Sequence, residues 1–393
     1  MRSKLSTLLI VSFVLSMFAF LSEAQAIPAF ARKYKISCTT CHTAMPKLKA
    51  YGDEIAGNGF IIPEDESKRD YVTAGDDLLL LNRNFPIAAR LDLRAVHNSD
   101  ENTDIDTDLQ TPWGLKLLSG GAIYKNISYY FYFYASERGE VAGIEDAYIH
   151  FNNIFGKELD IMAGQFQTSD PLMKRELRLT VEDYQAYKTP IGYSNTDLTY
   201  DRGLMFVYGL TKTSTDIIAM VVNGNGIGEA GGNKIFDDDK YKNLGLRINQ
   251  GIGDKVSIGG FAYYGKEDIR QNQYNGENEV TYLGPDVNVN LGTVEFTGQY
   301  LLRTDSEPMA NMEDVETNGI IAEVIYAPQK DKSRFYFIGL YNNVDCDLDA
   351  YDYETATLSA TYLLARNIRL LAEATRDMHN ESNRLVLGVV SAF

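Results

Sequence analysis

Short segments in which apolar and polar residues alternate fill the chain from residue 86 to its end. In the first segment Ile87, Ala89 and Leu91 fall on one face, and Arg90 and Asp92 fall on the other. A period of two predicts a β-strand whose two faces meet different surroundings. We predict sixteen strands in this way, over residues 86–97, 113–124, 127–136, 144–152, 158–166, 201–210, 215–222, 242–248, 256–264, 279–290, 293–302, 318–326, 334–342, 355–363, 368–375 and 383–393.

These strands are typical of a closed barrel in an outer membrane. Their number is even, and the 26 tyrosines and 18 phenylalanines of the chain suit its aromatic girdles. The connections alternate between long ones, such as 98–112 and 167–200, and short ones, such as 211–214. A soluble β-sandwich or propeller also has many strands, but it does not predict this alternation. We therefore expect an all-β fold, an antiparallel sixteen-stranded barrel over residues 86–393 with its long loops outside the cell.

The chain begins with the features of an export signal. Arg2 and Lys4 precede an apolar run that ends at Leu21, and Ala24-Gln25-Ala26 fits a signal peptidase site. An N-terminal membrane anchor is the alternative, but the run is shorter than the usual spanning length of about 20 residues. We expect residues 1–26 to be a signal peptide and the mature protein to leave the cytoplasm.

The stretch Cys38-Thr39-Thr40-Cys41-His42 follows this signal closely. Two cysteines spaced C-x-x-C and followed at once by histidine are typical of a c-type haem, with two thioether bonds and an imidazole under the iron. A redox dithiol is an alternative, although nothing around it alternates strand and helix as a thioredoxin does, and the histidine is then unexplained. A zinc site needs more ligands, and the other cysteine, Cys346, is far away in the sequence. We expect one covalent haem c, held by Cys38 and Cys41 with His42 as the metal ligand.

Residues 27–85 form the predicted haem segment and its linker. A short helix is expected from Ala44 through Gly52, ending near 57–60, followed by a charged connector over 63–70 and a small docking turn from Leu78 to Leu81. So short a segment cannot bury a core of its own. We expect it to pack against the barrel.

Charge restricts the partners. The chain has 37 basic and 54 acidic residues and a net charge of −17, so nucleic acid is not an expected partner. The predicted outer loops are acidic. They form a rim that concentrates cations near the mouth, or that is a solvated surface, or that is bridged to lipid headgroups by divalent ions. The acidic residues of the rim are Asp100, Glu101, Asp104, Asp106, Asp108, Asp237, Asp238, Asp239, Asp345, Asp347, Asp349, Asp352 and Glu354.

Basic residues are also predicted to point into the lumen. By strand parity these are Arg90, Arg94, Lys116, Arg247 and Arg369. They could pair with haem propionates or with a permeating anion, or they could balance the inward carboxylates. Those carboxylates are Asp92, Glu295, Glu323 and Glu373.

With these features the chain resembles the fused outer-membrane cytochrome-porins of iron-oxidising bacteria. The stretch from Phe30 through Cys38-Thr39-Thr40-Cys41-His42 to Gly59-Phe60 is similar to the haem segment of that family. The barrel, with Gly143-Ile144-Glu145-Asp146-Ala147-Tyr148 and Met162-Ala163-Gly164-Gln165-Phe166, is also similar to phosphate-selective porins. The resemblance implies an electron-transfer protein of the outer membrane, surrounded by its lipid, that oxidises extracellular Fe(II) and passes electrons to a periplasmic c-type cytochrome.

Several alternatives stay open at this point. Electrons could flow outward to an extracellular acceptor, or the chain could be a solute or anion porin whose haem segment is structural or sensory. The candidates for a sixth haem ligand are His97, His150 and Met45, none of them more than a candidate. No residue is expected to act in group-transfer catalysis. The sequence assigns no role to Cys346.

Overall fold

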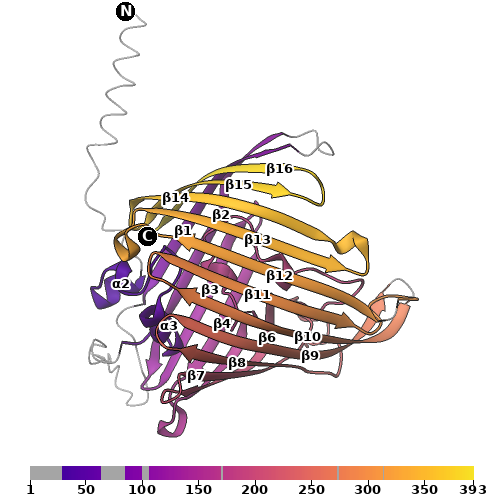
Figure 1. Ribbon diagram of the computed structural model, residues 1–393. Coiled ribbons are helices and arrows are strands. Elements are labelled where there is room, and N and C mark those ends of the chain that lie inside the picture. Colours follow the sequence, from indigo (N-terminus) through magenta and orange to yellow (C-terminus); the bar gives the residue numbers. More distant parts are fainter. Residues whose placement is uncertain (1–28, 63–84, 100–105, 170, 272–273, 313) are drawn as a thin grey trace, which may run out of the picture.

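The computed structural model describes residues 29–62, 85–99, 106–169, 171–271, 274–312 and 314–393. Sixteen antiparallel strands form one closed barrel, in which each strand pairs with its neighbours in the chain and β1 pairs with β16 (Figure 1). The predicted signal peptide over residues 1–26, the connector over 63–70 and the docking turn at Leu78–Leu81 lie outside the described residues.

All sixteen predicted strands are present. Their bounds are β1 Ile87–Asn98, β2 Thr107–Tyr124, β3 Ile127–Glu137, β4 Gly143–Phe151, β5 Leu159–Gln167, β6 Tyr200–Leu210, β7 Thr215–Val222, β8 Asn243–Ile252, β9 Val256–Gln271, β10 Tyr274–Asn290, β11 Val294–Asp305, β12 Val315–Tyr326, β13 Phe335–Cys346, β14 Tyr353–Ala365, β15 Ile368–Asp377 and β16 Asn383–Ala392. β1 starts, and β16 finishes, on the side of the barrel that carries the short turns. We call this the inner end, and the end with the long connections the outer end.

Several strands run further toward the outer end than the sequence predicts. The predicted loop 265–278 is mostly strand, because β9 continues to Gln271 and β10 begins at Tyr274. The apolar alternation stops there, but pairing continues through charged side chains, with Lys266 opposite Glu279 and 3.3 Å from its carboxylate. Cross-strand pairs of opposite charge stabilise a sheet in water. The pairing of β9 with β10 therefore continues beyond the residues that alternate between apolar and polar.

The two faces of the wall differ as the alternation predicts. On β16, Leu385 and Leu387 are 51% and 66% exposed on the outside, whereas Val386 between them is 1% exposed on the inside. Leucines that face outward over a closed wall suit a lipid environment. Within the described part of the chain, no helix is both long and apolar enough to cross a membrane, a finding that does not bear on strands.

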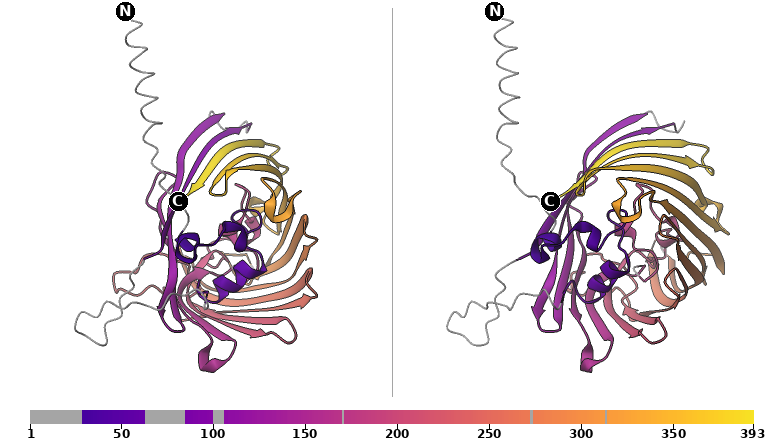
Figure 2. Two further views of the ribbon diagram at one scale, coloured as in Figure 1. Left: turned by 90° about the vertical axis from the view of Figure 1, so that its left-hand side faces the viewer. Right: turned by 60° about the vertical axis from the view of Figure 1, so that its left-hand side comes forward.

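The N-terminal segment, residues 29–62, lies inside the inner end of the barrel (Figure 2). It contains helix α2 (Ala29–Tyr34), a 3-10 turn η1 (Cys38–Thr40) and helix α3 (Ala50–Gly57). The prediction of a helix from Ala44 was wrong in its start. Residues 43–48 instead form a tight loop, closed by a hydrogen bond from the Thr43 amide to the Lys47 carbonyl at 3.1 Å, and the proline within it has no amide to donate.

The long connection between β5 and β6 folds into the lumen, and we call its described residues, 168–169 and 171–199, the strap. It contains two short 3-10 turns, η3 (Arg175–Leu177) and η4 (Gln185–Tyr187). The strap reaches opposite walls: Glu176 accepts a hydrogen bond from Lys116 on β2 at 3.0 Å, and Tyr184 donates one to Glu323 on β12 at 3.0 Å.

One side of the lumen is filled by an apolar core. Strap residues Met173, Tyr184, Tyr187 and Leu198 pack against inward side chains of the strands from β5 to β13. The strand residues of this core are Phe166, Met205, Met220, Val222, Phe261, Tyr263, Val280, Tyr282, Leu301, Ile321 and Leu340. Barrels of this kind usually have a polar interior, and on this side the structure differs because the strap provides an apolar partner for the inner wall.

The strap is also held by charge around Asp183. The guanidinium group of Arg175 donates to its carboxylate at 2.7 Å, and charged groups of Arg178 and Lys188 lie 3.7 Å away. Burial by itself would raise the pKa of the Asp183 carboxyl, but Arg178 and Arg175 hold it well below its usual range. The carboxylate therefore stays charged at any physiological pH.

We predict that Asp183→Asn loosens the strap by about 2 kcal/mol, because three cations lose a common partner. Amide hydrogen exchange over residues 171–190 should become roughly 30-fold faster. A group with a lowered pKa contributes stability above its unfolded pKa of about 3.9 and loses it as pH falls through the folded value. Wild-type protection should therefore be the same at pH 5 and pH 7.5. Lys188→Gln is the control, since that ammonium is 36% exposed, and an equal effect of both variants would contradict the prediction.

Candidate functional site

The cysteine motif forms a compact turn within the N-terminal segment. The Ser37 side chain caps η1, and the amide of His42 donates to the carbonyl of Cys38 at 3.0 Å. Both Cys38 and Cys41 are half-exposed and their thiols are free. Burial raises the pKa of the Cys41 thiol. The turn therefore presents two sulfur atoms and an imidazole from five consecutive residues.

The imidazole of His42 has a defined tautomer. Its Nδ1 lies 2.7 Å from the carbonyl oxygen of Pro46, and since a carbonyl only accepts, Nδ1 carries the proton. Burial lowers the pKa of His42 despite the opposing carbonyl hydrogen bonds, so the ring is neutral and Nε2 keeps its lone pair. Histidine ligands of metals typically donate their other nitrogen to a carbonyl in this manner. The His42 side chain thus has the tautomer and the hydrogen bond expected of a ligand to haem iron.

Helix α3 packs directly on the motif. At Gly52 a β-carbon would lie 2.2 Å from the carbonyl oxygen of Cys41, a contact that no side chain tolerates. The amide of Lys49, at the start of α3, donates to the same carbonyl at 2.9 Å. Gly52 therefore sets the distance between the helix and the cysteine turn.

Lys47 fixes the segment to the barrel. Its ammonium lies 2.9 Å from Glu295 on β11 and 3.2 Å from Glu323 on β12, and the Glu323 side chain is 2% exposed. Burial opposes the charge of Lys47, but Glu323 and Glu295 raise its pKa above the usual range. Both glutamates were predicted to point inward, and both do. Lys47 is the partner that parity alone did not identify.

Further contacts hold the segment on other sides. Tyr336 donates to the carbonyl of Thr43 at 3.1 Å, and Arg369 donates to that of Met45 at 3.2 Å. Phe60 stacks on Tyr130 of β3 at 4.7 Å between ring centroids. These pairs could not be read from the sequence, because each joins residues 70 or more positions apart.

The three candidates for a sixth ligand lie in different places. His97 is on the outer face of the barrel wall, so it is separated from the lumen. His150 faces inward and is 3% exposed, with Nε2 3.9 Å from Asp160. Met45 packs against the apolar cluster of Ala44, Leu179 and Tyr336. Among the described residues no three His, Cys, Asp or Glu side chains gather as a metal site, and Cys346 lies at the outer end of β13.

Comparisons with known proteins support the barrel. No protein-family profile and no curated sequence matches the chain. An anion-selective porin from Comamonas acidovorans matches with a TM-score of 0.58 at 10% identity, over 79% of this chain and 99% of the porin. This chain has the fold of outer-membrane porins. The loop-deleted OmpT of Vibrio cholerae matches with a TM-score of 0.57 at 12% identity, over 79% and 99%, and Salmonella typhi OmpF in complex with daunomycin with 0.56 at 11%, over 79% and 97%.

We predict that Lys47→Met releases the segment from the lumen, because it leaves the buried Glu323 carboxylate without its cation. The cost is about 3 kcal/mol, and exchange of the amides of residues 43–57 should become roughly 100-fold faster. Lys49→Met is the matched control: its partner Asp331 is 49% exposed, so that pair contributes less than about 1 kcal/mol. Equal exchange in the two variants would show that the buried pair does not anchor the segment.

Proposed function

We propose that this protein is an electron conduit of the bacterial outer membrane, with one haem c attached to Cys38 and Cys41 and ligated by His42. The observation that carries this proposal is the His42 imidazole, which donates through Nδ1 to Pro46 and keeps Nε2 free beside two free thiols. An ordinary surface turn has no reason to fix this tautomer next to two unpaired cysteines.

The location of the segment supports the same function. Residues 29–62 are held inside a barrel whose exterior is apolar, so a group attached there is shielded from lipid and reached through the two ends. A bound haem would supply one-electron chemistry of iron. The chain's own residues position it: α3 supports the cysteine turn, and Lys47 joins the turn to β11 and β12.

The proposed partners are an extracellular iron species at the outer end and a periplasmic c-type cytochrome at the inner end. The direction we propose is oxidation of Fe(II), with electrons passing inward. Outward transfer to an extracellular acceptor uses the same site, and the haem potential decides between the two. The second candidate, a solute porin with a structural or sensory haem segment, is favoured by the fold that the chain shares with porins.

The test is anaerobic stopped-flow spectroscopy of the purified, detergent-folded full chain. Haem bands should be present, and the oxidised protein should be reduced rapidly by added Fe(II). Both properties should be lost in Cys41→Ala and His42→Ala. A haem that is not reduced by Fe(II) but, once reduced, is oxidised quickly by ferric chelates would show that electrons flow outward. A folded barrel without haem would leave the porin alternative.

Two glycines of α3 provide a matched pair of variants. Gly52→Ala places a methyl group against the Cys41 carbonyl, whereas a β-carbon at Gly57 has no neighbour within 4 Å. We predict that Gly52→Ala lowers the haem-to-protein ratio several-fold, and that Gly57→Ala leaves it unchanged, since alanine favours a helix by up to about 1 kcal/mol. The ratio is measured from pyridine haemochrome absorbance. Equal loading of both variants would refute a role for the α3 contact.

A further inference from the structure

The two sides of the lumen have different chemistry. From β5 to β13 the inner wall is packed with apolar side chains of the strap. Across β15, β16, β1 and β2 the inward residues include a group of charged side chains beside a small apolar cluster of Val96, Leu371 and Val386. The strap contacts this wall through the carboxylate of Glu373, which accepts hydrogen bonds from the amides of Val181 and Glu182 at 2.7 and 2.9 Å. A hydrated solute therefore has its path along the charged wall.

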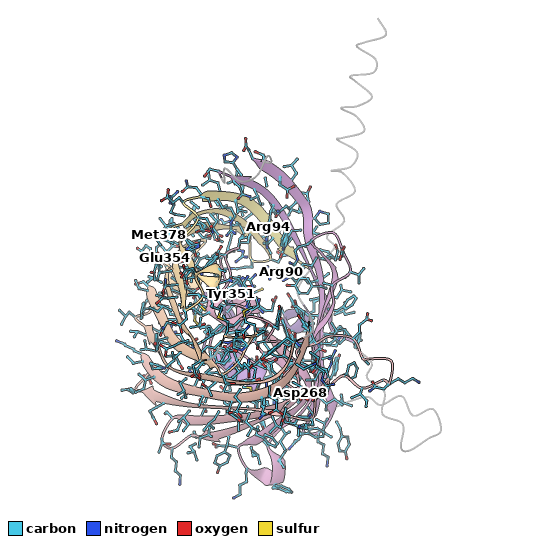
Figure 3. All side chains as sticks on the ribbon, turned by 90° about the vertical axis from the view of Figure 1, so that its right-hand side faces the viewer. Arg90, Arg94, Asp268, Tyr351, Glu354 and Met378 are labelled. Atoms are coloured by element: carbon cyan, nitrogen blue, oxygen red, sulfur yellow. The ribbon has the colours of Figure 1, made fainter. Side chains whose placement is uncertain are left out.

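Arginines dominate that wall. Arg90 donates to Asp92 at 2.8 Å through Nε, which leaves its terminal nitrogens free of this pair. Arg94 lies over the ring of Trp113 at 4.6 Å. Figure 3 shows Arg90 and Arg94 beside an open part of the barrel interior. Arg369 on β15 completes the group and is repelled by both of them.

The charges of this group do not balance. Three guanidinium groups, of Arg90, Arg94 and Arg369, have two carboxylates nearby, Asp92 and Glu373, and Glu373 is shared with Arg384, so the positive charges outnumber the negative ones. The other charged residues nearby have partners of their own. Lys116 pairs with Glu176 of the strap, and Glu373 has two backbone amides with Arg384 3.7 Å away. The surplus is thus local to the three arginines.

The arginine group adjoins the cysteine motif. Arg369 donates to the carbonyl of Met45, three residues after His42, and to that of Leu179 in the strap. A molecule that approaches the motif from the outer end along this wall meets Arg94 and Arg90 before it reaches Arg369. The last charges before the motif are therefore positive.

We propose that the redox partner which reaches the motif from the outer end is an anion, such as a carboxylate chelate of iron, and that such a chelate enters along this wall faster than free divalent iron does. This deepens the proposed function and rests on it. An Fe(II) chelate would lose one electron to the haem iron and leave as the Fe(III) chelate, with no bond to carbon formed or broken. The carboxylates of the chelate supply the negative charge that the three arginines lack.

The acidic outer rim does not reverse this selection. Asp345, Asp347 and Asp349 lie at the outer end of β13 or in the loop that follows it. Charges that water surrounds are screened over roughly 8–10 Å at physiological salt. Arg369 is buried and Arg90 and Arg94 are partly buried within the wall, where screening is weaker and the attraction for an anion correspondingly larger. Selection by charge thus occurs at the arginines.

The first experiment measures ion selectivity in planar bilayers under a gradient of KCl and does not depend on redox chemistry. The wild-type full chain should conduct and favour chloride over potassium several-fold. Arg94→Gln should lower that ratio at least twofold, and Asp92→Asn should raise it. Arg138→Gln is the control, because that side chain is 71% exposed and lies beyond β3 at the outer end. Heat-modified mobility in gels verifies that each variant is folded.

Three outcomes overturn the proposal: no conductance, a preference for potassium, or chloride preference found only in a haem-free Cys38→Ala, Cys41→Ala double variant. The last outcome would mean that the arginines pair with the carboxylates of the haem itself and do not attract an incoming anion.

The second experiment compares haem reduction by an anionic Fe(II) chelate and by cationic hexaammineruthenium(II). Arg94→Gln should slow haem reduction by the anionic chelate and leave the rate of reduction by the cationic complex unchanged. Equal slowing would overturn the inference while the proposed function stands. A chloride-selective barrel without haem would instead remove the function and leave an anion passage.

Discussion

Closure of the sheet between β1 and β16 is the constraint on which the rest of the structure depends. In lipid every backbone amide and carbonyl needs a partner, so a membrane sheet has no free edge. A closed wall of sixteen strands encloses a space wider than its own side chains fill. In this chain that space is partly filled by residues from outside the strands. Two stretches outside the strands, the N-terminal segment and the strap, enter it from opposite ends.

Those two stretches are held by different forces. The strap has an apolar core of its own with the wall from β5 to β13, supplemented by the charges around Asp183. The N-terminal segment has only small apolar clusters and relies on directional contacts, above all the Lys47 pair. The two meet where Leu179 packs against Ala44. A displacement of the strap would therefore change the packing next to the cysteine turn.

Strand number and order could be predicted because alternation with a period of two is a local property of the sequence. The outer ends of β9 and β10 could not, since charged cross-strand pairs such as Lys266 with Glu279 replace the apolar signal. The motif residues were found from their spacing, and whether they hold a haem stays a prediction. Lys47 with Glu323, or Phe60 with Tyr130, could not be paired from sequence, because nothing local in either residue specifies a partner so far along the chain.

The partners of the N-terminal segment bear on the order of assembly. Glu295, Glu323, Tyr336 and Arg369 all belong to the last third of the chain. Their inward positions are defined only once β11 to β15 have paired. The part of the protein that is synthesised first is therefore packed last. Until the barrel closes, Cys38 and Cys41 remain on an undocked tether, open to any enzyme that modifies them.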